Sequence, residues 1–185
     1  NPLASVGASR EIKLIISYEL TFLLFFAAII LKADQTMRMS EIIQAQAQAS
    51  PFIGSISGVL LLIVGVFCTQ AKLGMVPFDI AEAETELSEG SFIEYSGTIY
   101  AMVKLTKYIM LFILPALIVG FLMSGFHLEG MGILWAVLKL LAVVLLLTLI
   151  RNTNPRLKVK QAMRFFLIGM NALVIIAIVL IYLGL

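Results

Sequence analysis

Long apolar stretches alternate with short polar segments along this chain. The alternation predicts an all-α integral membrane protein, a single polytopic membrane domain over residues 1–185 with five transmembrane helices. We expect the spans at residues 12–32, 51–72, 93–125, 130–150 and 163–184. Each span supplies the ~20 residues that are needed to cross ~30 Å of hydrocarbon.

The polar segments predict the connections between these spans. Residues 1–9 are mostly small, which predicts a loop with Ser9 capping the helix that follows. A glutamine- and alanine-rich segment at residues 32–50 predicts a loop with one short surface helix. Residues 73–95 are predicted to form an acidic loop, and residues 151–164 a basic loop.

Composition supports the membrane interpretation and narrows the chemistry. The chain is 61% hydrophobic and 13% charged, with a mean hydropathy of +1.06, whereas soluble domains are about half apolar and about a quarter charged. Cys68 and His127 are the only cysteine and histidine. A disulfide framework and a thiolate or imidazole metal site made by this chain alone are therefore not expected. No metal ligand and no nucleic-acid partner is predicted.

Lysine and arginine fall unequally on the two predicted sides of the membrane. One side carries Arg10, Lys13, Lys72, Lys104, Lys107, Arg151, Arg156, Lys158, Lys160 and Arg164. The other side carries Lys32 and Arg38, and Lys139 lies within a span. Because cytoplasmic loops hold the excess of Lys and Arg, we expect the first residues, the acidic loop and the basic loop on the cytoplasmic side of a prokaryotic cell membrane.

The acidic loop concentrates six of the eleven acidic residues. They are Asp79, Glu82, Glu84, Glu86, Glu89 and Glu94. Asp79 with Glu82 fits a capping box that starts a helix ending before Gly90, and Ser91 with Glu94 fits a second one that starts the next span. Carboxylates a few ångströms apart raise one another's pKa, so the cluster could load and release protons near neutral pH. The alternative is a solvated acidic face with well-capped helix ends.

Two ionisable residues are predicted to lie inside the membrane. Glu19 lies about two turns into the first span, and Lys139 lies near the middle of the fourth. Each costs ~2.5–3.5 kcal/mol on insertion scales, so such residues usually pair or face a water-filled cavity. We interpret both, with the loop acids, as a proton path. Alternatively, Glu19 pairs with Lys13 or Lys104, and Lys139 extends its side chain to the interface.

The acidic loop and an N-terminal R-E-x5-S-Y-E pattern resemble a known family. It is the membrane subunit family shared by energy-converting membrane-bound [NiFe] hydrogenases and respiratory complex I, where it is subunit 1 and forms the quinone chamber. The matching residues are Arg10, Ser17, Tyr18, Glu19, Pro77, Phe78, Asp79, Glu82, Glu84, Glu86, Gly90, Glu94, Tyr95, Ser96, Gly97, Lys139, Arg151, Pro155, Arg156 and Gln161.

The resemblance implies a fold and a role. Members of the family contain about eight helices, so this chain is expected to be the C-terminal part of such a protein, without the first helices and the long tilted one. The resemblance implies a coupling subunit without an active site of its own. Glu19, Lys139 and the loop acids would be its coupling residues. Arg10, Tyr18, Pro77, Phe78, Tyr95, Arg151 and Arg156 would be docking or structural residues.

The resemblance also implies partners. Peripheral redox subunits would dock at the cytoplasmic loops, and antiporter-like and small membrane subunits would lie beside the chain in the lipid bilayer. The [NiFe] and iron–sulfur centres would be held by those partners, and quinone is expected only in a complex I subunit.

Departures from the complex I pattern favour the hydrogenase branch. The segment from Pro155 to Gln161 lacks the Asp that complex I usually has, Phe165 and Phe166 follow it, and the complex I Arg before Pro77 is absent. The alternative is the complex I subunit that lines the quinone chamber. A stand-alone secondary transporter would show two repeats with broken helices, and the sequence shows neither.

Overall fold

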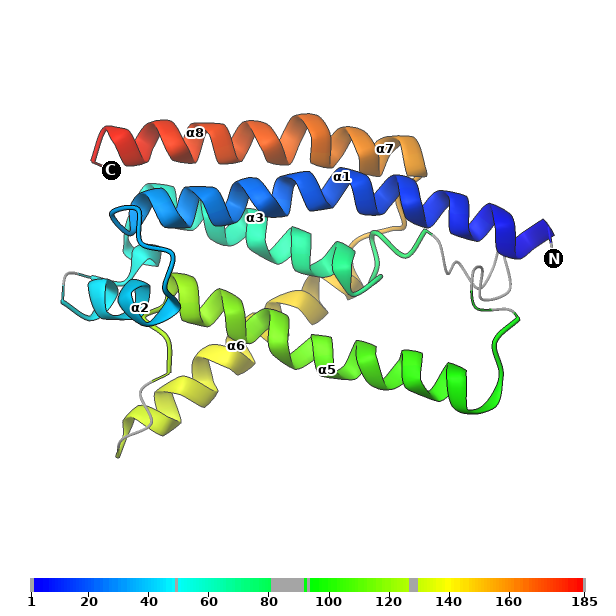
Figure 1. The fold of residues 1–185 in the computed structure, drawn as a ribbon, viewed down its shortest axis with the longest axis horizontal. Helices are drawn as coiled ribbons and strands as arrows, with labels where there is room; N and C mark the ends of the chain where they lie inside the picture. Colours follow the sequence, from blue (N-terminus) through cyan, green and yellow to red (C-terminus); the bar gives the residue numbers. More distant parts are fainter. Residues whose placement is uncertain (1, 49, 81–91, 93, 127–129, 185) are drawn as a thin grey trace.

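The computed structural model describes residues 2–48, 50–80, 92, 94–126 and 130–184. Every regular element in these residues is helical, which confirms the predicted all-α class. In chain order they are α1 (Pro2–Lys32), α2 (Met39–Gln48), a 3₁₀ turn (Phe52–Gly54), α3 (Ile56–Lys72), α5 (Gly97–Leu122), α6 (Gly132–Thr153), α7 (Val159–Arg164), a π-helical segment (Phe165–Met170) and α8 (Asn171–Tyr182) (Figure 1).

The structure has four described helices that are long and apolar enough to cross a membrane. They cover Ala4–Lys32, Gly97–Leu122, Gly132–Thr153 and Val159–Tyr182. The predicted span at residues 51–72 is a shorter apolar helix, because only Ile56–Lys72 is α-helical there. Proline at position 51 precedes a 3₁₀ turn, and the helix begins only after Ser55, whose hydroxyl accepts a hydrogen bond from the Gly58 N–H at 3.1 Å.

The prediction of an N-terminal loop was wrong. Helix α1 begins at Pro2, so Ser9 lies inside the helix and is not its cap. Proline is well suited to the first turn of a helix because its missing N–H has no intrahelical partner there. The small residues that follow include only one glycine before Ser9, and Gly7 is buried, so the packing of α1 overrides its weak helix propensity.

Two further boundaries differ from the prediction. Helix α5 begins at Gly97 rather than near position 93, so Glu94 lies before the helix and does not sit in its first turn. The basic loop is shorter than predicted, because Arg151 lies in the last turn of α6 and α7 already begins at Val159. The Gln161 Oε1 accepts the Lys158 N–H at 3.0 Å and so closes the start of α7.

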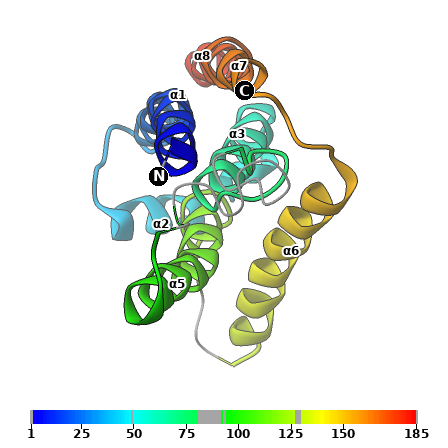
Figure 2. The same cartoon turned by 90° about the vertical axis from the view of Figure 1, so that its right-hand side faces the viewer.

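Helices α1, α3 and α8 form the packed centre of the molecule, and α5 lies against α3. Figure 2, which looks along these helices, shows α6 set apart from α1 and α8. A cluster of four phenylalanine rings, Phe67, Phe78, Phe165 and Phe166, joins α3, the segment after it and the π-helical segment. Phe78 and Phe166 are essentially inaccessible to solvent.

The helix bundle has two ends that carry different groups. We call one the loop end: it contains the first half of α1, residues 72–80, the start of α5, the end of α6 and residues 154–158 (Figure 1). We call the other the α2 end, because α2 lies there beside the C-terminus of α5. The predicted surface helix of the segment 32–50 is thus confirmed as α2.

Candidate functional site

The segment Pro77–Asp79 is held against the bundle at both of its ends. The Pro77 carbonyl accepts the Leu157 N–H at 3.0 Å. The Phe78 ring lies 4.8 Å from the Phe166 ring, centre to centre. Asp79 Oδ2 lies 3.0 Å from Arg156 Nη2. The start of the acidic loop is therefore tied to the short basic loop and to the last span.

Buried polar contacts also fix the turn just before this segment. Gln70, which is fully buried near the end of α3, donates from Nε2 to the Val76 carbonyl at 2.6 Å. The same amide nitrogen lies 3.4 Å from the Leu147 carbonyl of α6. Gln70 thus connects α3, the turn and α6, so the position of the loop start depends on three elements at once.

Glu19 forms an ion pair across two helices. Its Oε1 lies 2.5 Å from Nζ of Lys72, the last residue of α3. The Lys72 ammonium also lies over the Phe22 ring, 4.4 Å from its centre, and 5.4 Å from the centre of the Tyr18 ring. Pairing of Glu19 with a lysine was the alternative to a proton path, and the structure shows such a pair, but with Lys72 instead of Lys13 or Lys104. The sequence did not reveal this ion pair, because Glu19 and Lys72 are far apart along the chain and meet only when α1 and α3 lie side by side.

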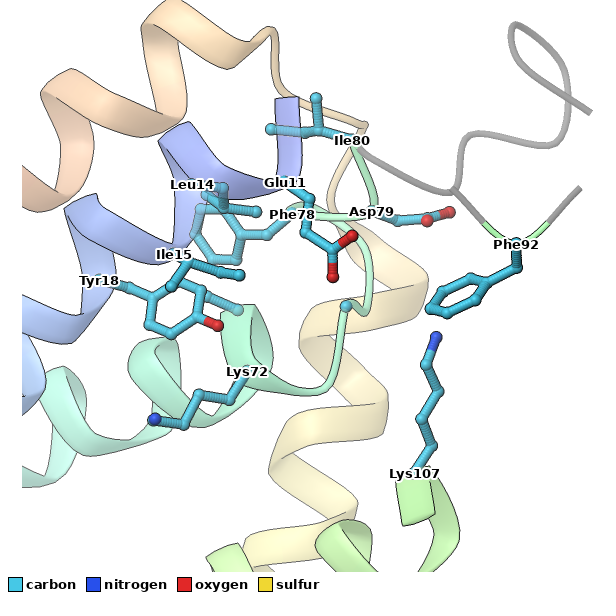
Figure 3. Close-up of a pocket in the computed structure, with 12 residues that line it drawn as sticks. Glu11, Leu14, Ile15, Tyr18, Lys72, Phe78, Asp79, Ile80, Phe92 and Lys107 are labelled. Carbon is cyan, nitrogen blue, oxygen red and sulfur yellow. The ribbon is translucent and has the colours of Figure 1, made fainter. Parts of the chain in front are cut away.

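A cavity of about 80 Å³ lies between α1, the end of α3 and the loop start. Its α1 wall is formed by Glu11, Leu14, Ile15 and Tyr18. The opposite walls are formed by Ala71, Lys72, Gly74, Phe78, Asp79, Ile80, Phe92 and Lys107. Figure 3 shows the Glu11 carboxylate and the Tyr18 hydroxyl turned towards this space, with Asp79 on its far side.

Basic residues from four helices, α1, α5, α6 and α7, and from the segment before α7 line two neighbouring hollows that Asp79 shares. One hollow, of about 240 Å³, is lined by Asp79, Lys104, Lys107 and Arg151 together with apolar side chains. The other, of about 560 Å³, is lined by Asp79, Arg10, Arg156, Lys158 and Lys160 among others. Arg10 and Arg156 are distant in sequence, and the fold brings both to the hollow that Asp79 lines. Their positive charges favour an anionic group in these hollows.

The remaining predicted site residues lie in different places. Glu94 and Tyr95 are exposed just before α5, where the Tyr95 ring lies 6.1 Å from that of Phe92. Glu82, Glu84, Glu86 and Glu89 lie outside the described residues, as does the predicted helix that would carry them. In the part of the chain that the structure describes, no three His, Cys, Asp or Glu side chains gather as metal ligands.

Lys139 is not beside the carboxylates. Its Nζ donates to the Met123 carbonyl at 2.6 Å, at the C-terminal end of α5. Asp79 and Glu94 lie towards the other end of that helix, whose 26 residues span roughly 39 Å at 1.5 Å per residue. Among the described residues, the structure therefore does not bring Lys139 to Glu19, Asp79 or Glu94. A cation at a helix C-terminus satisfies free carbonyls and the helix dipole.

Sequence reasoning missed Glu11 and Lys72 as site residues. Glu11 could have been found, because Glu11, Leu14, Ile15 and Tyr18 follow the i, i+3, i+4, i+7 spacing of one helix face. These four residues lie in the helix that was predicted to follow Ser9, so the face was recognisable from the sequence. Lys72 carried no such signal, since its role depends on the contact between α1 and α3.

Comparisons with known proteins place this fold in a family. The family model described as NADH dehydrogenase matches residues 1–182. An NADH-quinone oxidoreductase subunit from Brevibacillus brevis is 34% identical over 171 residues, which is 89% of this chain and 50% of the relative. The corresponding protein from Phocaeicola vulgatus is 32% identical over 176 residues, which is 87% of this chain and 49% of the relative. The chain thus spans about half the length of these curated relatives.

A solved structure shows the same fold over nearly the whole chain. It is a chain of the membrane-bound sulfane sulfur reductase, an archaeal respiratory membrane complex, and it matches with a TM-score of 0.89 and 25% sequence identity. The match covers 98% of this chain and 61% of that chain. The family model, the curated relatives and the solved fold agree, and the chain belongs to the NADH dehydrogenase family, which includes these subunits of NADH-quinone oxidoreductases.

Proposed function

We propose that this chain is the coupling subunit of a redox-driven ion-pumping membrane complex of the hydrogenase type. It would link electron transfer in a peripheral arm to the translocation of protons or sodium ions. The four long apolar helices and the shorter α3 would each cross a prokaryotic cell membrane, giving five spans. Partner subunits would hold the [NiFe] and iron–sulfur centres, and the chain itself would bind none.

The ion pair between Glu19 and Lys72 carries this proposal. Charged groups inside membrane spans are costly and are found where ions or protons move. Here a carboxylate in α1 is paired with an ammonium at the end of α3, directly before the segment that leads into the acidic loop. Protonation of Glu19 would remove its charge and release Lys72, so the pair has two states that differ in charge and in contact.

The anchored loop start offers a route by which a partner could bias these states. Asp79 is bound to Arg156, and the Phe78 ring packs in the phenylalanine cluster beside α3 and the last span. If a docked redox subunit displaced the acidic loop, the buried contacts of Phe78 and the ion pair of Asp79 would have to change. Packed cores respond to such displacements by switching between discrete packing arrangements and do not deform smoothly.

The distribution of basic residues supports the proposed orientation. Arg10, Lys72, Arg151 and Arg156 all lie at the loop end, while Lys32 lies at the α2 end. Under the positive-inside rule the loop end would face the cytoplasm. The hollow lined by Arg10, Arg156, Lys158 and Lys160 would then be available to a peripheral partner or to lipid.

The alternative is a subunit that lines a quinone-binding chamber. The names of the curated relatives favour it, since those proteins are NADH-quinone oxidoreductase subunits. The hydrogenase type is supported by the likeness to the sulfane sulfur reductase chain and by the departures around Pro77 and Pro155. The two differ in the electron acceptor, so an assay of the acceptor distinguishes them.

The test uses the intact complex in sealed vesicles, with Glu19→Gln and, as a matched control, Glu41→Gln. Glu41 lies in α2, where its carboxylate pairs with Arg38 at the surface. Electron transfer and ion uptake are measured together. We expect Glu19→Gln to keep electron transfer and to lower ion uptake about a hundredfold, the low side of the effect of a positioned proton carrier, with Glu41→Gln unchanged.

Unchanged ion uptake in Glu19→Gln would contradict the coupling role. Equal losses of electron transfer and uptake in a complex that reduces quinone would favour the quinone-chamber alternative. Purified complex must be assayed for assembly first, because a variant that fails to assemble would lose both activities for a structural reason.

A further inference from the structure

Lys72 belongs to two adjoining polar environments. Its ammonium pairs with Glu19, and its side chain also forms part of the wall of the 80 Å³ cavity that Glu11 and Asp79 line. Tyr18 has the same double position, since it precedes Glu19 in sequence and its hydroxyl faces the cavity (Figure 3). The cavity therefore reaches from the loop start to the immediate surroundings of the intramembrane carboxylate.

The cavity is large and polar enough to hold water. One water needs about 10–15 Å³ of such volume and two to four polar partners, and the cavity measures about 80 Å³. The residues with polar or charged side chains on its walls are Glu11, Tyr18, Lys72, Asp79 and Lys107. Several hydrogen-bonded waters in contact with a carboxylate can carry protons to it and away from it.

We propose that Glu11 is a proton-carrying residue, which takes protons from water in this cavity and passes them on towards Glu19. In each transfer the Glu11 carboxylate accepts a proton from a protonated water and returns it to the next water. The proton ends on the Glu19 carboxylate, which loses its charge and its ion pair with Lys72. No electron moves in these steps, and the direction of transfer rests on the proposed coupling function.

The position of Glu11 suits this role better than a purely structural one. It lies two turns before Glu19 in α1, on the face that also presents Leu14, Ile15 and Tyr18 to the cavity. Leucine and isoleucine separate the carboxylate from the phenol along the helix, so direct transfer between side chains is blocked and water has to bridge them. The Phe92 ring, with the Lys107 ammonium 5.3 Å from its centre, lines the side of the cavity next to α5.

Two variants test the inference by different means in the intact complex. Glu11→Gln removes the exchangeable proton but keeps the shape of the side chain. Ile15→Phe narrows the cavity without changing any charge, and Ile16→Phe is its control, because Ile16 is 66% exposed and does not line the cavity. We expect Glu11→Gln to slow ion uptake about a hundredfold and Ile15→Phe to slow it as well, with electron transfer retained and Ile16→Phe normal.

A spectroscopic readout separates proton transfer from a structural effect. Redox-induced infrared difference spectra of the wild type should contain a carboxyl C=O band that shifts in D₂O, and Glu11→Gln should lose this band. Normal uptake in both Glu11→Gln and Ile15→Phe, or an unchanged infrared spectrum in Glu11→Gln, would overturn the inference. If Glu19→Gln fails to uncouple the complex while Glu11→Gln does, the proton-carrying role of Glu11 stands, whereas Glu19 is not its proton acceptor and the coupling role proposed for Glu19 falls.

Discussion

The ammonium of Lys139 donates a 2.6 Å hydrogen bond to the carbonyl oxygen of Met123, the residue that closes α5. Gln46 of α2 binds the same helix end, because its Nε2 lies 3.4 Å from the Gly120 carbonyl and 3.1 Å from that of Phe121. Two side chains from two other helices thus satisfy carbonyls that the end of a helix leaves without partners. Lys139 is placed as a cap of α5.

We predict that Lys139→Met destabilises the protein without uncoupling the complex. A hydrogen bond to a charged group contributes about 1.5–3 kcal/mol, and the Met123 carbonyl would lose this donor. Thermal unfolding of the purified complex should occur at a lower temperature, and Lys139→Arg should recover most of the loss. A variant of normal thermal stability with reduced ion uptake would instead show that Lys139 carries protons.

Gln46 gives a second stability prediction at the α2 end. Besides its two donor contacts to α5, its Oε1 accepts the Ser124 N–H at 2.9 Å and the Phe52 N–H at 3.4 Å. Gln46→Leu would leave these buried groups without partners, at about 1–3 kcal/mol for each one that water cannot reach. The control is Gln44→Leu, since Gln44 is exposed on the same helix. Equal melting temperatures of the two variants would refute the role of Gln46.

Gly58 should tolerate no side chain. A Cβ atom there would lie 1.7 Å from the Phe52 carbonyl oxygen, so the 3₁₀ turn would have to move away from α3. Crowding of this kind typically costs about 1–3 kcal/mol, and we expect Gly58→Ala to lower the yield and thermal stability of the complex. Gly169→Ala is the matched control, because a Cβ atom there meets nothing within 4 Å. A Gly58→Ala complex as stable as this control would contradict the close approach.

The ion pair between Asp79 and Arg156 should restrain the start of the acidic loop. Both side chains are partly accessible, and pairs of this kind contribute about 0.2–1 kcal/mol. We therefore expect Arg156→Gln to speed hydrogen–deuterium exchange of the Leu157 amide, which is bonded to the Pro77 carbonyl, by up to about fivefold. Mass spectrometry of peptides from the complex measures this, with Lys160→Gln as control. Equal exchange in wild type and Arg156→Gln would mean that the loop start is held by its other contacts and does not need the ion pair.

The long spans and the separation of charge were predictable from the chain alone. Apolar runs of about twenty residues have few alternatives to a membrane helix, because backbone groups in lipid must bond within their own segment. The acidic loop was equally visible, since its charges are close together in sequence. The helix boundaries were less predictable. The start of α1 at Pro2 depends on packing, which overrode the loop preference of the small residues there.

What only the tertiary structure decided is which charges meet. Glu19 pairs with Lys72 and Asp79 with Arg156, and in both cases the partners lie far apart along the chain, so no spacing rule joins them. Lys139 and Glu19 were both predicted as intramembrane charges, yet Lys139 caps α5 and Glu19 pairs with the last residue of α3. The sequence alone determined which charged residues the protein has and in which segments they lie, because both follow from the order of residues along the chain. Their partners were set by the side-by-side packing of α1, α3, α5 and α6, because a Coulomb interaction depends on distance in space.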